Sequence, residues 1–269
     1  MIIILTQCFP SRVGGIETLM YNLALHLSRS KDVIVLADQQ NFKEDNIFDQ
    51  NEINFSTKRF RGIKFLRNRK KFNELKKIHG SSKIDAVISD SWKSLEVTID
   101  FLKKNKIPVI SLAHGNEIII KNDKHHKRVK KILEYVNAIV VNSSYTKNLL
   151  NKLSNNFKNV KIIYPGINIK KNYIEENISL NQGSPTLLTL ARLEKRKGHA
   201  LILKSIMNLK KYFPDIQYII AGEGEELDSI KNKIKEYNLQ DNVNLVGTVN
   251  ENQKNYIFSN TDVMIMPTL

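Results

Sequence analysis

Two cations five residues apart, Arg192 and Lys197, follow the apolar run TLLTLA at residues 186–191 and precede Gly198. Arginine offers phosphate oxygens a planar fork of N–H donors, and lysine adds a compact positive charge. A helix beginning after Gly198 would add the partial positive charge of its N-terminus. Together these groups predict a site that neutralises a diphosphate leaving group without a metal ion. The alternative interpretation is a basic loop that is merely solvated.

A histidine in an earlier loop also has a position that favours binding. His114 follows the apolar run PVISLA at residues 108–113 and stands beside Gly115. Ligands of open α/β sheets bind outside the carboxyl ends of the strands. We therefore expect His114 to donate a hydrogen bond to a substrate hydroxyl or phosphate. A histidine that only caps the next segment is the alternative.

Glycines in three further loops would let the backbone approach a ligand closely. Gly14 and Gly15 precede a helical pattern, whose start offers free N–H groups to an anion. A plain strand-to-helix turn explains this pair equally well, and the G-x-G-x-x-G fingerprint of a dehydrogenase is not present. The other loops each follow a later apolar run and offer Gly222 and Gly224, and then Gly247, Thr248 and Val249, whose backbone could read the edge of a nucleobase.

Signatures of several other chemistries are missing from the sequence. It has no Asp-x-Asp pair, no Walker lysine loop, no G-x-S-x-G elbow and no Cys/His cluster with metal spacing. We therefore expect chemistry with neither metal nor cofactor. The single cysteine, Cys8, excludes an intrachain disulfide. The net charge of +15 indicates an anionic partner or a lysine-rich genome, but charge without a recognition motif does not support nucleic-acid binding.

Short β-branched runs alternate with helix-compatible segments along the chain. This pattern predicts an α/β fold, with parallel sheets covered by helices on both faces. The expected strands are 2–5, 33–37, 86–89, 108–113, 138–141, 161–164, 186–191, 217–221, 243–246 and 263–266. The expected helices are 16–28, 70–78, 94–104, 124–135, 145–153, 199–211, 225–237 and 253–259.

A polar, Asn-rich stretch divides this alternation. It predicts a linker at residues 171–184 between a lobe at 1–170 and a second lobe at 185–269. The second lobe has four expected strands, whereas a doubly wound sheet has about six. We therefore expect the second lobe to be incomplete.

The loops, taken in order, resemble the retaining glycosyltransferases of the GT-B fold, family 4 (group 1), over nearly the whole chain. The matching stretches are FPSRVGGIE, HGNE, VNSSYTKNLL, YPGIN, ARLEKRKG, IIAGEGEE and VNLVGTVNENQKNYIFSNTDVMIMPT. The resemblance implies two Rossmann-like lobes with parallel sheets facing a cleft. It also implies transfer of a sugar from a UDP- or GDP-sugar donor to an acceptor, with retention of configuration.

The resemblance also assigns roles to residues. Arg192 and Lys197 match the R-x4-K motif that holds the diphosphate, and His114 matches the histidine that contacts the transferred sugar. Donor contacts fall on Gly14, Gly15, Gly222, Gly224, Gly247, Thr248 and Val249, and acceptor-side positions on Glu17, Asn116, Asn142 and Ser143.

Two departures from the family pattern stand out. Asn168 replaces the usual Asp after P-x-G-[IV], at the hinge between lobes. The Glu-x7-Glu motif, which contacts the donor sugar and ribose, does not follow MIMPT, so we expect a chain truncated before it.

Basic residues gather in the first lobe, at Thr57–Lys77 and Lys121–Lys131. Since this lobe holds the acceptor in the GT-B fold, we expect a lipid-linked or saccharide acceptor and peripheral contact with an anionic membrane. No signal peptide is recognisable, so we expect a cytoplasmic location, at the inner face of the cell membrane. The expected pathway is bacterial surface polysaccharide or lipopolysaccharide assembly in the cell envelope. Two alternatives stay open: a sugar-nucleotide 2-epimerase of the same fold, and a non-catalytic truncated remnant.

Overall fold

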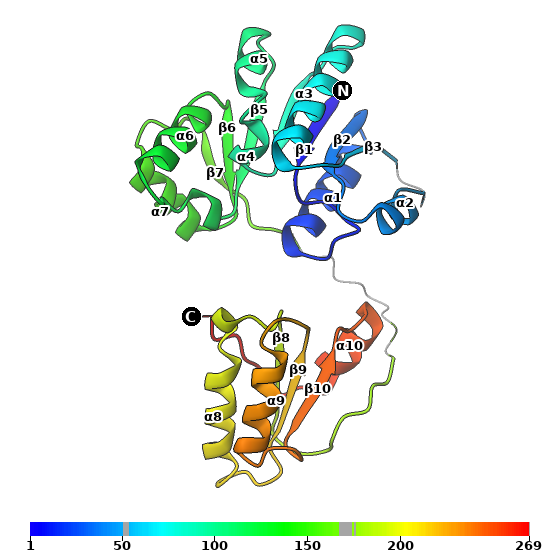
Figure 1. Ribbon diagram of the computed structural model, residues 1–269, viewed down its shortest axis with the longest axis vertical. Helices are drawn as coiled ribbons and strands as arrows, with labels where there is room; N and C mark the ends of the chain where they lie inside the picture. Colours follow the sequence, from blue (N-terminus) through cyan, green and yellow to red (C-terminus); the bar gives the residue numbers. More distant parts are fainter. Residues whose placement is uncertain (51–53, 167–173, 175, 269) are drawn as a thin grey trace. The chain divides into compact units, whose positions relative to one another are not determined.

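The computed structural model describes residues 1–50, 54–166, 174 and 176–268. The chain forms two compact units, Met1–Ile167 and Asn168–Leu269 (Figure 1). The expected linker lies partly outside the described residues, as does Asn168. Within the described part of that stretch, Ile178 and Leu180 pack against the core of the second unit.

The first unit is built on seven parallel strands, in the order β3-β2-β1-β4-β5-β6-β7. Strand β1 pairs with both β2 and β4, so the order reverses beside it. Because all pairings are parallel, the loops that follow the strands lie along one edge of the sheet. The strands are β1 Ile2–Thr6, β2 Val33–Asp38, β3 Ser56–Phe60, β4 Ala86–Ser89, β5 Val109–Ala113, β6 Ala138–Val141 and β7 Val160–Ile162.

Helices cover both faces of this sheet. One core contains strand residues such as Ile3 and Val87 together with the apolar sides of α3 to α7. The opposite core contains Ile4 and Val35 together with Met20 of α1. The helices are α1 Gly15–Leu27, α2 Phe42–Gln50, α3 Lys64–Ser81, α4 Trp92–Leu95, α5 Ile99–Lys104, α6 Asp123–Leu133 and α7 Ser144–Leu153, with a 3-10 turn η1 at Asn116–Ile118. This confirms the predicted doubly wound α/β arrangement of the first unit.

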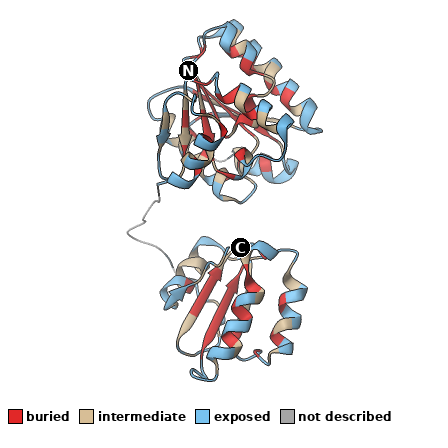
Figure 2. Cartoon of the chain, turned by 90° about the vertical axis from the view of Figure 1, so that its left-hand side faces the viewer, coloured by how far each residue is buried: buried red, intermediate tan, exposed pale blue. Residues whose placement is uncertain are grey.

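The second unit repeats the plan on a smaller scale, with four parallel strands in the order β10-β9-β8-β11. Helices α8 and α9 pack on one face and α10 on the other. The central strands are buried, as Figure 2 shows. The elements are β8 Thr186–Leu190, η2 Lys195–Lys197, α8 His199–Leu209, β9 Gln217–Ala221, α9 Leu227–Glu236, β10 Val243–Gly247, α10 Glu251–Ser259 and β11 Val263–Met264.

Two elements of the first unit were not predicted. Strand β3 reads STKRF and lies at the edge of the sheet, so it has no run of apolar residues to reveal it. Helix α2 reads FKEDNIFDQ and buries only Asp45. A predicted helix at 94–104 is instead two helices, α4 and α5, separated at residues 96–98. No helix in the described residues has both the length and the apolar character needed to cross a membrane.

Candidate functional site

Asp90 joins the loops that follow β1 and β4. Its carboxylate oxygen Oδ2 accepts hydrogen bonds from Thr6 Oγ1 at 3.0 Å, Gln7 N at 2.7 Å and Cys8 N at 3.3 Å. The other oxygen, Oδ1, accepts from Ser94 Oγ at 2.6 Å. Asp90 is 2% exposed, so these donors supply the partners that a buried carboxylate requires. The sequence reading did not single out Asp90.

His114 lies at the carboxyl end of β5, as predicted, and its ring is half-buried. Its Nε2 lies 3.0 Å from the backbone carbonyl of Asp90. A carbonyl oxygen can only accept, so Nε2 is the ring nitrogen that carries a proton in this contact, and the tautomer that fits it has its lone pair on Nδ1. The His114 N–H donates to Glu117 Oε1 at 2.6 Å. In this tautomer Nδ1 is the atom that can accept a hydrogen bond from a sugar hydroxyl.

The glycine pair begins α1, and its two members have different surroundings. A Cβ on Gly14 would meet Glu17 Oε2 at 2.1 Å, whereas one on Gly15 would meet no atom within 4 Å. Glu17 is buried and pairs with Arg12, whose Nε lies 3.1 Å from Glu17 Oε1. Position 14 therefore has no room for a side chain, because the Glu17 carboxylate lies over it. The space above Gly15 is open to a ligand.

An ion-pair cluster that the sequence reading missed anchors the preceding loop. Arg59 in β3 pairs with Asp45 at 3.0 Å and Asp49 at 2.6 Å, and its Nη2 donates to the Pro10 carbonyl. Asp45 Oδ1 also accepts from Ser11 Oγ at 2.8 Å. The cluster fixes the segment just before Gly14. Its members come from β3, α2 and the loop after β1, so spacing along the chain gave no sign of it.

Two of the acceptor-side candidates, Asn142 and Ser143, serve the local fold. Ser143 is the N-cap of α7 and accepts from Thr146 N at 3.2 Å. Asn142 Oδ1 accepts from Thr146 Oγ1 at 2.8 Å. Both residues therefore stabilise the start of α7. Asn116 begins η1 and is exposed.

An apolar hollow of about 280 Å³ opens beside His114 and Asn142. Leu19 and Leu23 of α1 line one side, and residues of β4, β5 and β6 line the other. The hollow brings one predicted donor-sugar residue and one predicted acceptor-side residue to the same cavity of the first unit.

In the second unit, Arg192 and Lys197 both lie in the segment between β8 and α8, as predicted. Arg192 has a side chain that is 68% exposed, and its Nη1 lies 3.2 Å from Glu194 Oε1. Lys197 has no ion-pair partner among the residues that the structure describes. Gly198 follows with φ +70°, and a Cβ there would meet the Pro267 carbonyl at 2.6 Å. Glycine therefore lets the loop turn tightly between Lys197 and α8.

The three loops after β8, β9 and β10 lie side by side. A Cβ on Gly222 would meet the Ala191 carbonyl at 2.0 Å, and one on Gly224 would meet the Leu193 carbonyl at 2.4 Å. The Gly222 N–H donates to the Gly247 carbonyl at 2.7 Å. The glycines therefore let the β9 loop pack directly against the Arg192 segment. Beyond them, Thr248 is exposed, and Val249 packs against the core under α10.

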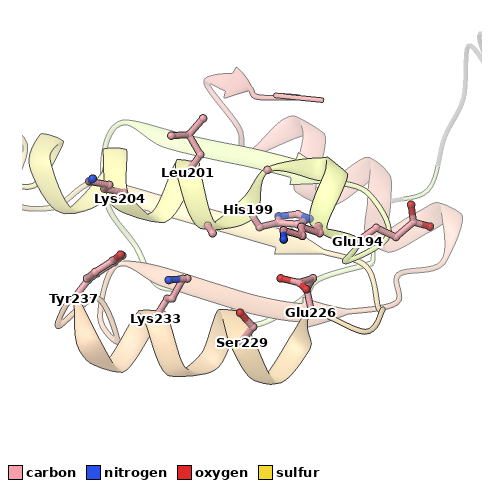
Figure 3. A pocket seen from close by; sticks show the side chains of 11 residues that line it. Glu194, His199, Leu201, Lys204, Glu226, Ser229, Lys233 and Tyr237 are labelled. Atoms are coloured by element: carbon pink, nitrogen blue, oxygen red, sulfur yellow. The ribbon is translucent and has the colours of Figure 1, made fainter. Parts of the chain in front are cut away.

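A larger hollow of about 590 Å³ follows the groove between α8 and α9 (Figure 3). Leu201 and Lys204 line it from α8, and Lys233 of α9 and Tyr237 just after that helix line the other side. Its lining contains neither Arg192 nor Lys197. His199, at its head, is 2% exposed, and burial lowers the pKa of its imidazole. Glu194, Lys195 and Gly198 of the predicted diphosphate loop line this hollow, whereas the two cations predicted to hold the diphosphate do not.

Comparison with known families identifies the class of protein. The family model described as Glycosyltransferase Family 4 matches residues 13–171, more than half of the chain. The model described as Glycosyl transferases group 1 matches residues 170–269. The chain therefore belongs to glycosyltransferase family 4, as the ordered loops predicted.

Individual relatives are distant. A GDP-mannose-dependent monoacylated alpha-(1-6)-phosphatidylinositol monomannoside mannosyltransferase of Corynebacterium glutamicum is 19% identical over 98% of this chain and 71% of its own length. An N-acetylgalactosamine-N,N'-diacetylbacillosaminyl-diphospho-undecaprenol 4-alpha-N-acetylgalactosaminyltransferase of Campylobacter jejuni is 33% identical over 40% of this chain and 30% of its own. The chain spans less than half the length of other curated relatives, for example 32% of the phosphatidylinositol N-acetylglucosaminyltransferase gpi3 subunit of Schizosaccharomyces pombe.

Solved structures share the fold. Sucrose-phosphate synthase from Thermosynechococcus elongatus superposes with a TM-score of 0.77 at 17% identity, covering 99% of this chain and 75% of that one. HepE of Anabaena, in complex with UDP, superposes with a TM-score of 0.73 at 14% identity, covering 99% and 74%. These likenesses confirm the predicted fold class, in which each unit is Rossmann-like and the whole is GT-B.

Proposed function

We propose that this chain binds a UDP- or GDP-sugar and transfers the sugar, with retention of configuration and without a metal ion, to a lipid-linked or saccharide acceptor. The observation that carries the proposal is the position of Arg192 and Lys197. Both follow β8 at the carboxyl edge of the second unit's parallel sheet, in the part of the chain that the group 1 glycosyltransferase model matches. Relatives whose names specify GDP-mannose dependence and a diphospho-undecaprenol acceptor support this choice of substrate classes.

The proposed chemistry is the neutralisation of a leaving group. As the bond between the sugar C1 and the β-phosphate oxygen breaks, negative charge builds on the diphosphate. The Arg192 guanidinium and the Lys197 ammonium would stabilise that charge. The acceptor oxygen would form its bond to C1 on the face that the diphosphate leaves, and its proton would pass to a phosphate oxygen. No charge then remains without a partner.

The first unit would orient the sugar and the acceptor. His114, with its proton held on Nε2 by Asp90, presents Nδ1 to a sugar hydroxyl. The open space above Gly15 would accept the donor, and the exposed Asn116 would face the acceptor. Glu17, predicted on the acceptor side, is buried and would act by holding the glycine loop through its ion pair with Arg12. Gly247, Thr248 and Val249 would frame the nucleobase. We place this reaction in bacterial surface polysaccharide or lipopolysaccharide assembly, at the inner face of the cell membrane.

Product analysis tests this proposal directly. The chain is incubated with UDP-glucose, UDP-N-acetylglucosamine or GDP-mannose, with and without an undecaprenyl-diphosphate-linked sugar, and products are separated by mass spectrometry. Transfer requires the acceptor and releases the nucleoside diphosphate, and NMR of the product shows the anomeric configuration of the donor. A product that forms without acceptor and retains the nucleotide would instead indicate an epimerase and overturn the proposal.

A further inference from the structure

The entry to α3 exposes three large apolar side chains together. Ile63 is 70% exposed, Phe65 is 58% exposed and Leu66 is 47% exposed. All six residues from Arg61 to Leu66 are exposed. Single exposed apolar residues are common on folded proteins and need no explanation. A contiguous group of them, as here, marks a contact surface. We call residues 61–70 the basic apolar tip.

Cations surround these apolar side chains. Residues 61–70 read RGIKFLRNRK, with five cations and no carboxylate. Of these, Arg67 pairs with buried Asp38 at 2.9 Å. The other four, Arg61, Lys64, Arg69 and Lys70, have no ion-pair partner among the described residues. The Arg69 guanidinium lies 5.3 Å from the centre of the Phe65 ring, which holds positive charge directly beside apolar surface.

The tip shares an edge of the sheet with the candidate site. It follows β3 directly, and β3 is parallel to β1 and β5, so it lies at the carboxyl edge that carries Asp90 and His114. Lys71, which follows the tip, donates from Nζ to the Thr6 carbonyl at 2.6 Å and pairs with Asp38 at 2.5 Å. Both Lys71 and Asp38 are buried. This buried pair fixes the base of the tip to the end of β1.

We propose that the basic apolar tip inserts Ile63, Phe65 and Leu66 into an anionic lipid bilayer, with the surrounding cations on the phosphate headgroups. Apolar residues flanked by lysine and arginine match the boundary between acyl chains and headgroups. A nucleic-acid surface would attract the cations but leave the three apolar side chains without a partner. Such insertion would deliver a lipid-linked acceptor to the edge that holds His114, and this part rests on the proposed function.

Co-sedimentation of the full chain with vesicles tests the insertion. We expect binding to phosphatidylcholine vesicles containing 30% phosphatidylglycerol and little binding to phosphatidylcholine alone. The triple variant Ile63→Ser, Phe65→Ser, Leu66→Ser should lower the vesicle partition constant by about tenfold or more, because it removes the apolar area that the tip would bury in the bilayer. Circular dichroism and urea midpoints equal to wild type would show that it folds.

A matched pair of charge variants separates the tip from overall charge. Arg61→Glu with Lys64→Glu should weaken binding by about tenfold or more. Lys104→Glu with Lys106→Glu makes the same change in net charge at two exposed positions, the end of α5 and the loop before β5, on the opposite edge of the sheet. It should leave binding within about twofold. An equal loss of vesicle binding in the two charge-variant pairs would overturn the proposal. So would a triple serine variant that binds vesicles as tightly as wild type. Binding to a single-stranded RNA in place of vesicles would favour nucleic acid and also overturn it.

Titration of the same proteins with UDP or GDP measures nucleotide binding separately from membrane binding. The tip variants should bind nucleotide like wild type, because the proposed diphosphate loop is in the other unit. If the wild-type chain binds vesicles but not nucleotide, the donor assignment is rejected and the proposed membrane contact is still supported.

Discussion

His114 Nε2 lies 3.0 Å from the backbone carbonyl of Asp90, while the Asp90 carboxylate accepts from Thr6 and Gln7 at the end of β1. One buried residue therefore sets the tautomer of the histidine and also holds the start of the glycine loop. The two loops that the sequence predicted separately are joined through a third, after β4.

Replacing Asp90 with alanine should destabilise the first unit by about 2–4 kcal/mol. The change leaves the Gln7 N–H and the buried Ser94 hydroxyl without their acceptor. Urea denaturation followed by circular dichroism measures the change in the free energy of unfolding. Asp100→Ala is the control, since that side chain is 77% exposed, and it should cost less than about 0.5 kcal/mol. Equal effects in the two variants would show that Asp90 does not join these loops.

Cys8 should react slowly and with a steep pH dependence. Burial, and then the negative charges of Asp90 and Glu17, raise the pKa of its thiol to about 12. The thiolate is the reactive form, so at pH 8 the folded chain should react with iodoacetamide roughly a thousandfold more slowly than the urea-unfolded chain.

The rate for the folded chain should rise about tenfold per pH unit between about pH 7.5 and 9.5, whereas the unfolded chain levels off near its ordinary pKa. The sign for stability follows from the same shift. Above about pH 8.5 the unfolded state loses the thiol proton first, so this group lowers stability as the pH rises. Mass spectrometry follows the alkylation. A folded rate equal to the unfolded rate would show that the partly buried Cys8 thiol does not hold its proton as expected.

Gly222→Ala should destabilise the second unit by at least about 2 kcal/mol. Gly222 has φ +138°, and the new Cβ would meet the Ala191 carbonyl at 2.0 Å. Gly80→Ala is the matched control. Gly80 lies in α3 with no atom within 4 Å of the added Cβ, so alanine should be neutral or stabilise by up to about 1 kcal/mol. Thermal unfolding of both variants measures the contrast, and tolerance of Gly222→Ala would show that the β9 loop does not pack on the Arg192 segment as described.

Gly15→Ala should weaken the binding of donor without destabilising the fold. Its Cβ would enter open space, so the free energy of unfolding should change by less than about 1 kcal/mol. If donor lies against this backbone, the Kd for nucleotide sugar should rise by about tenfold or more. Calorimetry measures the Kd, with Gly80→Ala as the control for a glycine away from the site. An unchanged Kd would remove Gly15 from the donor site.

The central strands could be predicted from the sequence because they are buried on both faces and read as continuous apolar runs. Strand β3 could not, since STKRF at the sheet edge carries its cations at the surface and on the Asp45 and Asp49 carboxylates. The loops containing His114, Arg192 and Lys197 were predicted correctly in place, because ligand loops follow strands.

Roles that depend on contacts distant in the chain were not visible in the sequence. Asp90 gains its importance from Thr6, 84 positions away. Gly222 and Gly224 were predicted to bring backbone to a ligand, yet the carbonyls of Ala191 and Leu193 already explain why no side chain fits there. Asn142 and Ser143 likewise have a structural explanation in the cap of α7.

The most direct test of the account is the affinity for nucleotide sugar when the two cations of the β8–α8 segment are removed. The double variant Arg192→Ala, Lys197→Ala should raise the Kd for UDP-glucose or GDP-mannose, whichever wild type binds, by about a hundredfold or more, because two charge-assisted contacts to the diphosphate are lost. Lys211→Ala with Lys231→Ala removes two exposed cations elsewhere in the same unit and should leave the Kd within about twofold. Equal Kd values in the two double variants, measured by calorimetry on folded protein, would contradict the claim that Arg192 and Lys197 hold the diphosphate.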